Sequence, residues 1–175
     1  KVKLINATSD AVNLLLFTKN TRLMNDEDAY DKVSKWDDEK KQAELDYMLQ
    51  TIRSSWEFID YTFDIRDVSR GFTHQFVRTR QASYAQQSQR TVDMVGFTYY
   101  TPERIYKDET ANVIYDDAMR MINEKYQELR SLGIPAEDAR GVLPTNIHTN
   151  IVAKFNLRTL SEMAKSRLSP RAQGE

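Results

Sequence analysis

The chain of 175 residues contains no cysteine and only two histidines, His74 and His148. Without cysteine it has no disulfide framework, no zinc site built on thiolates, no iron–sulfur cluster and no thiolate nucleophile. Two histidines leave few candidates for Ser-His-Asp chemistry and none for a histidine-rich metal site. We therefore expect neither a cysteine-based mechanism nor a bound metal.

Long apolar runs and an excess of one charge are also missing. No run approaches the ~20 apolar residues of a membrane span, and no signal-peptide pattern opens the sequence, so we expect a cytoplasmic protein without a membrane segment. The 25 Lys and Arg against 26 Asp and Glu leave a net charge of −1. The hydrophobic fraction of 40% and the charged fraction of 29% are typical of a globular protein. The length predicts one domain over residues 1–175.

Sequence periodicity predicts both strands and helices. Alternation of apolar and polar residues predicts strands at 1–7, 58–66 and 147–157. Apolar spacing and capping residues predict helices from Ser9 or Asp10, through 45–52, over 69–80, over 108–132, over 136–143 and from Arg158 onward. The charged stretch 25–41 is expected to be a loop that leads into a helix, and the segment 82–90 is expected to be an irregular loop. We therefore predict an α+β fold with a mixed or antiparallel sheet flanked by helices.

The segment 69–90 carries four arginines, Arg70, Arg78, Arg80 and Arg90, and no acidic residue. A solvated helix normally interleaves Glu and Asp for pairing, and this segment does not. Guanidinium groups bind phosphate in a bidentate way, and the Gln and Ser side chains of the segment can read the edges of a base.

A second group of arginines comprises Arg140, Arg158 and Arg167. Two of them have simple structural explanations, because Arg140 could pair with Glu137, and Arg158 with Glu162. On the pattern alone, a binding site and a solvated surface both remain open.

Two blocks of the sequence, in order and in register, resemble flavin-dependent thymidylate synthases. That family has an Arg-His-Arg triplet, a serine about eight residues beyond it and an arginine two further on. The matching residues here are Arg78-Thr79-Arg80, Ser83 and Ser88-Gln89-Arg90. The second block comprises Ala139-Arg140, Leu143-Pro144, Asn156-Leu157-Arg158-Thr159-Leu160, Arg167 and Ala172-Gln173-Gly174-Glu175. A weaker third match is Ser54-Ser55-Trp56-Glu57.

The resemblance implies a methyltransferase of nucleotide biosynthesis that makes dTMP from dUMP. It implies FAD as cofactor, methylenetetrahydrofolate as carbon donor and NADPH as reductant. It also implies a homotetramer with active sites shared between subunits. The other class of thymidylate synthases attacks the pyrimidine with a cysteine, so the lack of cysteine agrees with this resemblance.

The resemblance also implies roles for individual residues. The expected dUMP contacts are Gln75, Arg78, Gln86, Gln87, Ser88, Gln89, Arg90, Arg140 and Arg167. The expected FAD contacts are Ser54, Arg78, Thr79, Arg80, Gln81, Gln86, Asn156, Leu157, Arg158 and Glu162. Arg167 is the expected catalytic residue, which polarises the pyrimidine and favours ionisation at N3. Ser88 has no histidine placed beside it by the sequence, so we interpret it as a contact and not as a nucleophile.

Several positions depart from the family pattern. Thr79 replaces the central histidine of the triplet, Thr91 replaces a tyrosine, and Phe58 stands where a histidine is usual. Glu162 replaces a neutral amide, and a carboxylate there should make the flavin harder to reduce. These changes fall on the flavin and folate side, whereas the nucleotide arginines are intact. A working synthase, an enzyme with a different C5 product such as a hydroxymethylated nucleotide, and a non-catalytic nucleotide-binding protein all remain open.

Two alternatives come from other functional classes. A nucleic-acid-binding module would use the basic loop with Tyr84 and the pair Tyr99-Tyr100 to stack bases, but the net charge argues against it. A structural protein would use the long predicted helix. Its expected apolar stripe comprises Ile114, Ala118, Met121, Ile122 and Leu129, which we expect to pack on this chain's own sheet or on another subunit.

Overall fold

The centre of the protein is a four-stranded antiparallel sheet with strand order β1-β2-β4-β3. The strands are β1 (Val2–Ala7), β2 (Asp60–Ser69), β3 (Ala82–Gln86) and β4 (His148–Asn156). A computed structural model describes residues 1–51 and 53–169. Helices flank the sheet, which confirms the predicted α+β class.

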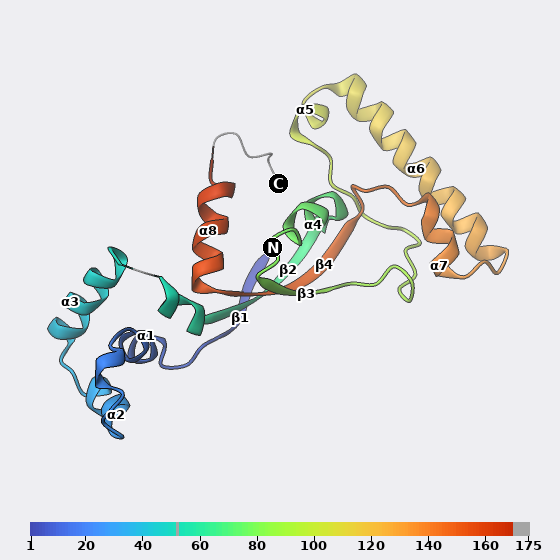
Figure 1. Ribbon diagram of the computed structural model, residues 1–175. Coiled ribbons are helices and arrows are strands. Elements are labelled where there is room, and N and C mark those ends of the chain that lie inside the picture. Colours follow the sequence, from blue (N-terminus) through green and yellow to red (C-terminus); the bar gives the residue numbers. More distant parts are fainter. Residues whose placement is uncertain (52, 170–175) are drawn as a thin grey trace.

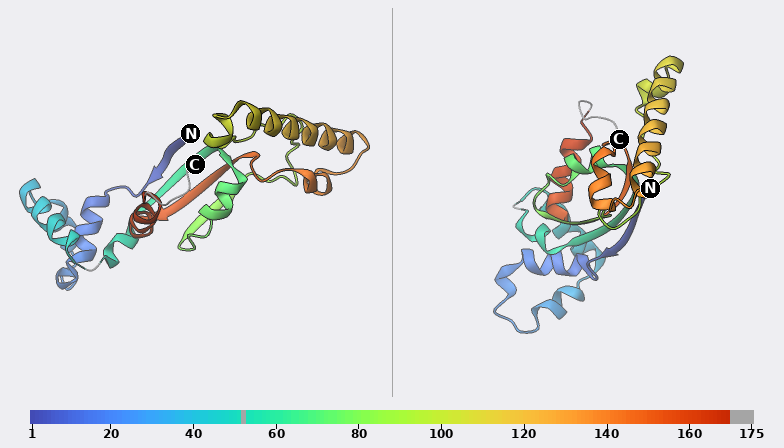
Figure 2. Two further views of the ribbon diagram at one scale, coloured as in Figure 1. Left: turned by 90° about the horizontal axis from the view of Figure 1, so that it is seen from above. Right: turned by 90° about the vertical axis from the view of Figure 1, so that its right-hand side faces the viewer.

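The helices lie around the sheet and at both of its ends (Figures 1 and 2). They are α1 (Ala11–Lys19), α2 (Ala29–Ser34), α3 (Asp38–Leu49), α4 (Arg70–Phe76), α5 (Glu103–Tyr106), α6 (Glu109–Ser131), α7 (Ala136–Ala139) and α8 (Leu157–Arg167). Helices α1 to α3 form one end of an elongated molecule, and α6 and α7 form the other (Figure 2).

A bulge near the end of β2 sets the direction of the chain into α4. The register between β2 and β4 shifts between Ile65 and Val68. Asp67 lies inside this bulge with a left-handed φ of 57°, and its backbone N–H donates to Oδ1 of Asn150 at 3.2 Å. Ser69 then accepts a hydrogen bond from the backbone N–H of Phe72 at 2.9 Å, which caps α4 as predicted.

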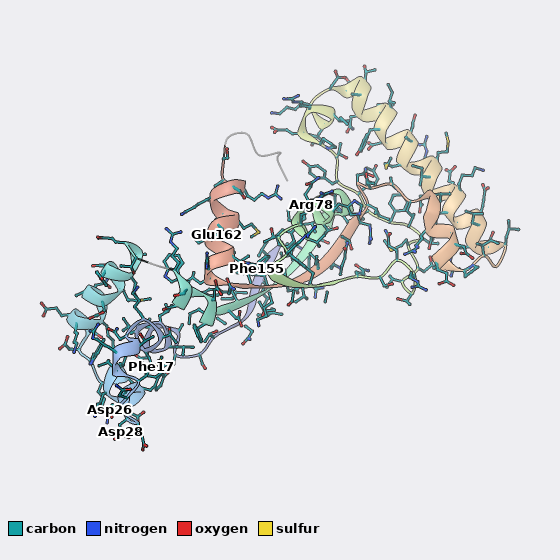
Figure 3. All side chains as sticks on the ribbon, viewed as in Figure 1. Phe17, Asp26, Asp28, Arg78, Phe155 and Glu162 are labelled. Carbon is teal, nitrogen blue, oxygen red and sulfur yellow. The ribbon has the colours of Figure 1, made fainter. Side chains whose placement is uncertain are left out.

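The main core lies between the sheet and helices α4 and α8. Strand β4 buries alternate residues on this side, including Ile151, Ala153 and Phe155. Leu160 of α8 and Phe76 of α4 pack against them. Phe155 lies in the sheet beside α8 (Figure 3). This core fixes the positions of the two helices that carry Gln75, Leu157, Arg158, Glu162 and Arg167 of the expected site.

Replacing Phe155 by alanine should lower the free energy of unfolding by about 3–5 kcal/mol, because the fully buried ring leaves a cavity. Its ring contacts those of Phe76 at 5.5 Å and Tyr84 at 5.9 Å between centroids. Phe58→Ala is the matched control, since Phe58 is 57% exposed. Urea unfolding of both variants measures the difference, and equal losses would contradict this description of the core.

A second core holds the N-terminal helices together. Leu16 of α1, Val33 of α2 and Met48 of α3 are buried against one another. The prediction of a loop over 25–41 is therefore wrong at α2, because the burial of Val33 stabilises a short helix in this charged stretch. The helix into which the loop was expected to lead is α3. Helix α3 begins at Asp38, after Asp37 accepts a hydrogen bond from the N–H of Lys40. The predicted helix residue Ile52 lies outside the described residues.

Two predictions within the arginine-rich segment are wrong. The helix expected over 69–80 ends at Phe76, and 82–86 of the expected loop form strand β3. β3 pairs with β4 from Ala82 opposite Phe155 to Gln86 opposite Ile151. This non-local pairing overrides a composition that favours turns. Residues 87–90 form no regular element, as expected.

The long helix α6 has the predicted bounds, but the residues that it buries are not those of the predicted apolar stripe. Asp108 accepts a hydrogen bond from the N–H of Ala111 at its start, and Gly133 follows its end with a φ of 81°. Met119 and Tyr126 are the buried residues, whereas Ile114 and Met121 are 66% and 61% exposed. Ile122 and Leu129 are half-buried. The predicted stripe therefore does not pack as a whole on this chain's own sheet.

The remaining boundaries shift by a few residues. Strand β2 begins at Asp60, after a 3₁₀ turn over Ser54–Phe58, and continues to Ser69. The helix predicted over 136–143 is α7 followed by a 3₁₀ turn over Arg140–Val142. In the ranges 1–51 and 53–169, no helix is long and apolar enough to cross a membrane.

Candidate functional site

The turn after α4 presents the arginines of the triplet. The backbone N–H of Arg78 donates to the carbonyl of Gln75 at 3.2 Å, which closes the end of the helix. The Tyr84 hydroxyl donates toward the carbonyl oxygens of Phe76 at 3.1 Å and Thr79 at 2.8 Å. Arg78 and Arg80 are exposed and form no ion pair within the described part of the chain. Arg78 lies next to α4 in Figure 3.

The tyrosines considered for base stacking have structural roles instead. Tyr84 is half-buried, and burial raises the pKa of its hydroxyl. The Tyr99 hydroxyl donates to Asp116 at 2.8 Å, and the carbonyl of Tyr100 accepts from Tyr115 at 3.2 Å. These contacts weaken the nucleic-acid-binding alternative.

Helix α8 brings its last residue to the end of α4. Nη2 of Arg167 donates to the carbonyl oxygen of Gln75 at 3.3 Å, across 92 residues of sequence. Two expected dUMP contacts therefore lie side by side. Arg167 is exposed and forms no ion pair in the residues described.

Two glutamines of the motif are already engaged in the fold. Nε2 of Gln86 donates to the hydroxyl of Thr73, which is fully buried, at 2.9 Å. Oε1 of Gln87 accepts from Nδ2 of Asn150 at 3.0 Å. These bonds tie the end of β3 to α4 and β4, so they position the loop that follows.

The loop after β3 holds Ser88, Gln89 and Arg90. The hydroxyl oxygen of Ser88 accepts from the backbone N–H of Arg90 at 3.1 Å. The Gln89 side chain is 9% exposed, and its Nε2 has no hydrogen-bond partner among the described residues. A buried amide donor without a partner is costly, and a bound ligand with an acceptor oxygen would satisfy it.

Arg90 and Arg140 meet at Glu137, although 47 residues separate Arg90 from Glu137 in the sequence. Nη2 of Arg90 pairs with the Glu137 carboxylate at 3.1 Å. Nε of Arg140 donates to the backbone carbonyl of the same residue at 3.0 Å. The ion pair expected between Arg140 and Glu137 is therefore not formed, because Arg90 takes the carboxylate.

The residues expected to bind FAD at the start of α8 lie beside the 3₁₀ turn that contains Ser54. Arg158 pairs with Glu57 of this turn at 2.6 Å and with Glu162 at 3.2 Å. The Glu57 carboxylate first, and then Glu162, raise the pKa of the Arg158 guanidinium. Asn156 caps α8, because its Oδ1 accepts from the N–H of Thr159 at 2.8 Å. The ion pair with Glu162 that the sequence suggested is confirmed.

An apolar pocket of about 270 Å³ lies next to these residues. Its walls include Leu15 of α1, Leu45 and Met48 of α3, Trp56, and Leu157 of α8. It touches the expected flavin contacts only at Leu157. The side chain of Gln81 is exposed and forms no hydrogen bond within the described part of the chain. The sequence match at 172–175 lies outside the described residues.

The expected site residues thus form separate groups on one chain. One group joins Gln75 to Arg167, a second surrounds Glu137, and a third surrounds Arg158. Sequence reasoning missed Glu57 as a partner of Arg158 and assigned no role to Arg70. Both residues lie within or next to the matched segments, but only the folded chain shows their neighbours. No cluster of His, Asp and Glu side chains in the described ranges could hold a metal.

Comparisons with known proteins identify the family. The family model described as thymidylate synthase complementing protein matches residues 3–175. The flavin-dependent thymidylate synthase of Sulfurisphaera tokodaii is 37% identical, over 99% of this chain and 68% of its own length. Those of Geobacter sulfurreducens and Pyrococcus abyssi are 39% and 42% identical, over 70% and 68% of this chain. These alignments cover 54% and 50% of the two relatives, so the chain spans about half to two thirds of such proteins. The chain belongs to the flavin-dependent thymidylate synthase family.

Proposed function

We propose that this chain methylates dUMP at C5 to form dTMP, with FAD as cofactor, methylenetetrahydrofolate as carbon donor and NADPH as reductant. One observation carries the proposal. Four arginines of the family motifs form no ion pair within the described residues, namely Arg78, Arg80, Arg140 and Arg167. Unpaired guanidinium groups concentrated in the matched segments are suited to anionic ligands.

The group around Glu137 suits the phosphate of the nucleotide. Arg90 and Arg140 supply two guanidinium groups, and a phosphate dianion would compete with Glu137 for Arg90. The free Nε2 of Gln89 in the same loop supplies a donor for an oxygen of the nucleotide. Ser88 adds a hydroxyl next to Arg90. Together these groups would bind the phosphate and orient the pyrimidine.

Arg167 is the proposed catalytic residue. A guanidinium stays charged at all physiological pH values, so it cannot act as a general acid or base. Placed at the uracil carbonyl, it would stabilise negative charge as that charge develops on the ring at N3. Its hydrogen bond to the carbonyl of Gln75 would hold it in position.

The residues present are compatible with FAD. Arg78 and Arg80 offer two guanidinium groups without carboxylate partners to a diphosphate, and Thr159 of α8 has a buried hydroxyl without a partner among the described residues. Arg158 would have to exchange Glu57 or Glu162 for the cofactor. When bound, the flavin would supply the hydride chemistry, and the protein would bind and orient it against the base.

The separation of the site residues into groups supports active sites shared between subunits of a homotetramer. Helix α6 offers a surface for such contacts, because Ile114 and Met121 are exposed and their spacing of seven residues puts them on the same face of the helix. Large apolar side chains exposed on one helix face are suited to an interface.

Introducing charge on that surface should break the assembly. The double variant Ile114→Glu, Met121→Glu is expected to shift the protein from a tetramer to a smaller species, because burying two carboxylates in an interface is unfavourable. Gln127→Glu adds a carboxylate elsewhere on the exposed surface of α6 and should leave the tetramer intact. Light scattering after gel filtration gives the mass of each variant. An unchanged tetramer in the double variant would place the interface elsewhere.

A titration with dUMP tests the proposed function at the level of binding. We expect the protein to bind dUMP and to bind deoxyuridine, which lacks the phosphate, far more weakly. Calorimetry measures both, with a single-stranded oligonucleotide as the comparison ligand. Salt-sensitive binding of the oligonucleotide without any binding of dUMP would instead support a nucleic-acid-binding module.

A second candidate function keeps the nucleotide site and changes the product. Thr79 in the triplet and the pairing of Glu162 with Arg158 favour it, because both alter the flavin side of the site. A hydroxymethylated deoxypyrimidine nucleotide is the product that this candidate predicts.

A further inference from the structure

The side-chain amide of Gln86, at the end of β3, belongs to a chain of hydrogen bonds that includes two buried threonines. Thr73 of α4 is fully buried, and its hydroxyl donates to the carbonyl oxygen of Arg70 at 2.9 Å. Nε2 of Gln86 donates to the same hydroxyl oxygen at 2.9 Å and to Oγ1 of Thr149 on β4 at 3.5 Å. Because both threonines are buried, water does not compete for these bonds.

The hydroxyl of Thr73 determines which end of the Gln86 amide faces it. A carbonyl oxygen only accepts hydrogen bonds, so the single hydrogen of the hydroxyl is used on Arg70. The hydroxyl oxygen can then only accept, and its partner on Gln86 must be the donor Nε2. Oε1 of Gln86 therefore faces away from Thr73. This oxygen accepts no hydrogen bond from the described residues and is not enclosed by them.

The neighbouring Gln87 is oriented in the opposite sense by its own partners. The backbone N–H of Asp67 donates to Oδ1 of Asn150 at 3.2 Å, so Asn150 presents its Nδ2 donor to Oε1 of Gln87 at 3.0 Å. In Gln87 the acceptor end of the amide is engaged, whereas in Gln86 the donor end is engaged. The surrounding fold, and not the residue type, therefore decides which end of each amide stays available.

We propose that Thr73 is a positioning residue that holds Gln86 as a hydrogen-bond acceptor for the nucleotide. Gln86 lies two residues before Ser88 in the motif, and Thr73 lies two residues before Gln75 on α4. A phosphate dianion has no hydrogen to donate, whereas the nucleoside part of dUMP has N–H and O–H groups. The free oxygen of Gln86 is therefore suited to the nucleoside part and not to the phosphate. The inference rests on the proposed function, because it takes dUMP as the ligand.

A double-mutant cycle on dUMP affinity, measured by calorimetric titration, tests the inference. Thr73→Val keeps the shape of the side chain but removes the hydroxyl, so it should weaken dUMP binding about threefold to tenfold. Thr73→Ser keeps the hydroxyl and should bind dUMP as the wild-type protein does. In a Gln86→Met background, Thr73→Val should cause no further loss, because Thr73 acts through Gln86.

Thr18→Val is the matched control, since the hydroxyl of Thr18 donates to the carbonyl oxygen of Leu14 within α1 at 2.8 Å. This variant should leave dUMP affinity unchanged. Thr73→Ala takes the place of the valine variant if that variant does not fold. An unchanged affinity after loss of the Thr73 hydroxyl would overturn the inference, as would an equal loss with and without the Gln86 amide.

The side-chain amide protons of Gln86 provide a measurement without the nucleotide. Their NMR signals should exchange slowly with water in the wild-type protein and in Thr73→Ser, and faster in Thr73→Val, because the buried acceptor is then lost. Equal exchange in the wild-type protein and Thr73→Val would overturn the inference. If exchange changes as expected but the wild-type protein does not bind dUMP, Thr73 still orients Gln86 and the proposed function fails.

Discussion

Replacing Arg167 by alanine is expected to lower kcat by about 10²–10³-fold, while the affinity for dUMP changes far less. The reason is that the proposed interaction strengthens only as charge develops on the pyrimidine, so its loss falls on the transition state. The structure holds this guanidinium at the carbonyl of Gln75, at the meeting point of α4 and α8. Steady-state kinetics together with calorimetric titration of dUMP separate the two effects.

Lys165→Ala is the matched control for this prediction. Lys165 is an exposed cation on the same last turn of α8. Its removal should leave both kcat and dUMP affinity unchanged. If Arg167→Ala weakened dUMP binding as much as it lowered kcat/KM, Arg167 would serve only to anchor the substrate.

Replacing Arg78 or Arg80 by alanine is expected to abolish the yellow colour of the purified protein, because bound FAD is lost. Each arginine offers a guanidinium that no carboxylate in the described part engages. A charged hydrogen bond to a phosphate contributes about 1.5–3 kcal/mol, so the loss of one should weaken FAD binding about tenfold or more. The flavin absorbance per chain after gel filtration measures retention.

Arg104→Ala controls for the general loss of a surface cation. Arg104 lies on α5, is exposed and also lacks an ion pair in the described part of the chain. This variant should stay yellow. A wild-type protein that is folded and tetrameric but colourless after incubation with FAD would contradict the proposed role of the flavin.

The local sequence pattern predicted the elements whose own residues determine their structure. β1, β2 and β4 follow from alternation, and α6 from its apolar spacing and the cap at Asp108. β3 did not follow, because Ala82–Gln86 is stabilised by pairing with β4, far along the chain. Helix α2 was not predicted for the same reason, since the burial of Val33 against α1 and α3 is a tertiary effect.

In the candidate site too, the sequence indicated individual residues but not the contacts between distant segments. The resemblance implied that Arg90 and Arg140 are both dUMP ligands, and only the fold shows that both touch Glu137. The sequence suggested a partner for Arg158 on its own helix, whereas Glu57 comes from a turn 101 residues away. Spacing along a helix is visible in a sequence, but contacts between distant segments are not.

The central claim is that this chain, despite Thr79 and Glu162, adds a methyl group to C5 of dUMP. Mass analysis of the nucleotide formed from dUMP, methylenetetrahydrofolate, FAD and NADPH tests it most directly. The proposed function predicts a product heavier than dUMP by one CH₂ group, the mass of dTMP. A product heavier by CH₂O, or unchanged dUMP with a correctly folded and flavin-loaded protein, would contradict it.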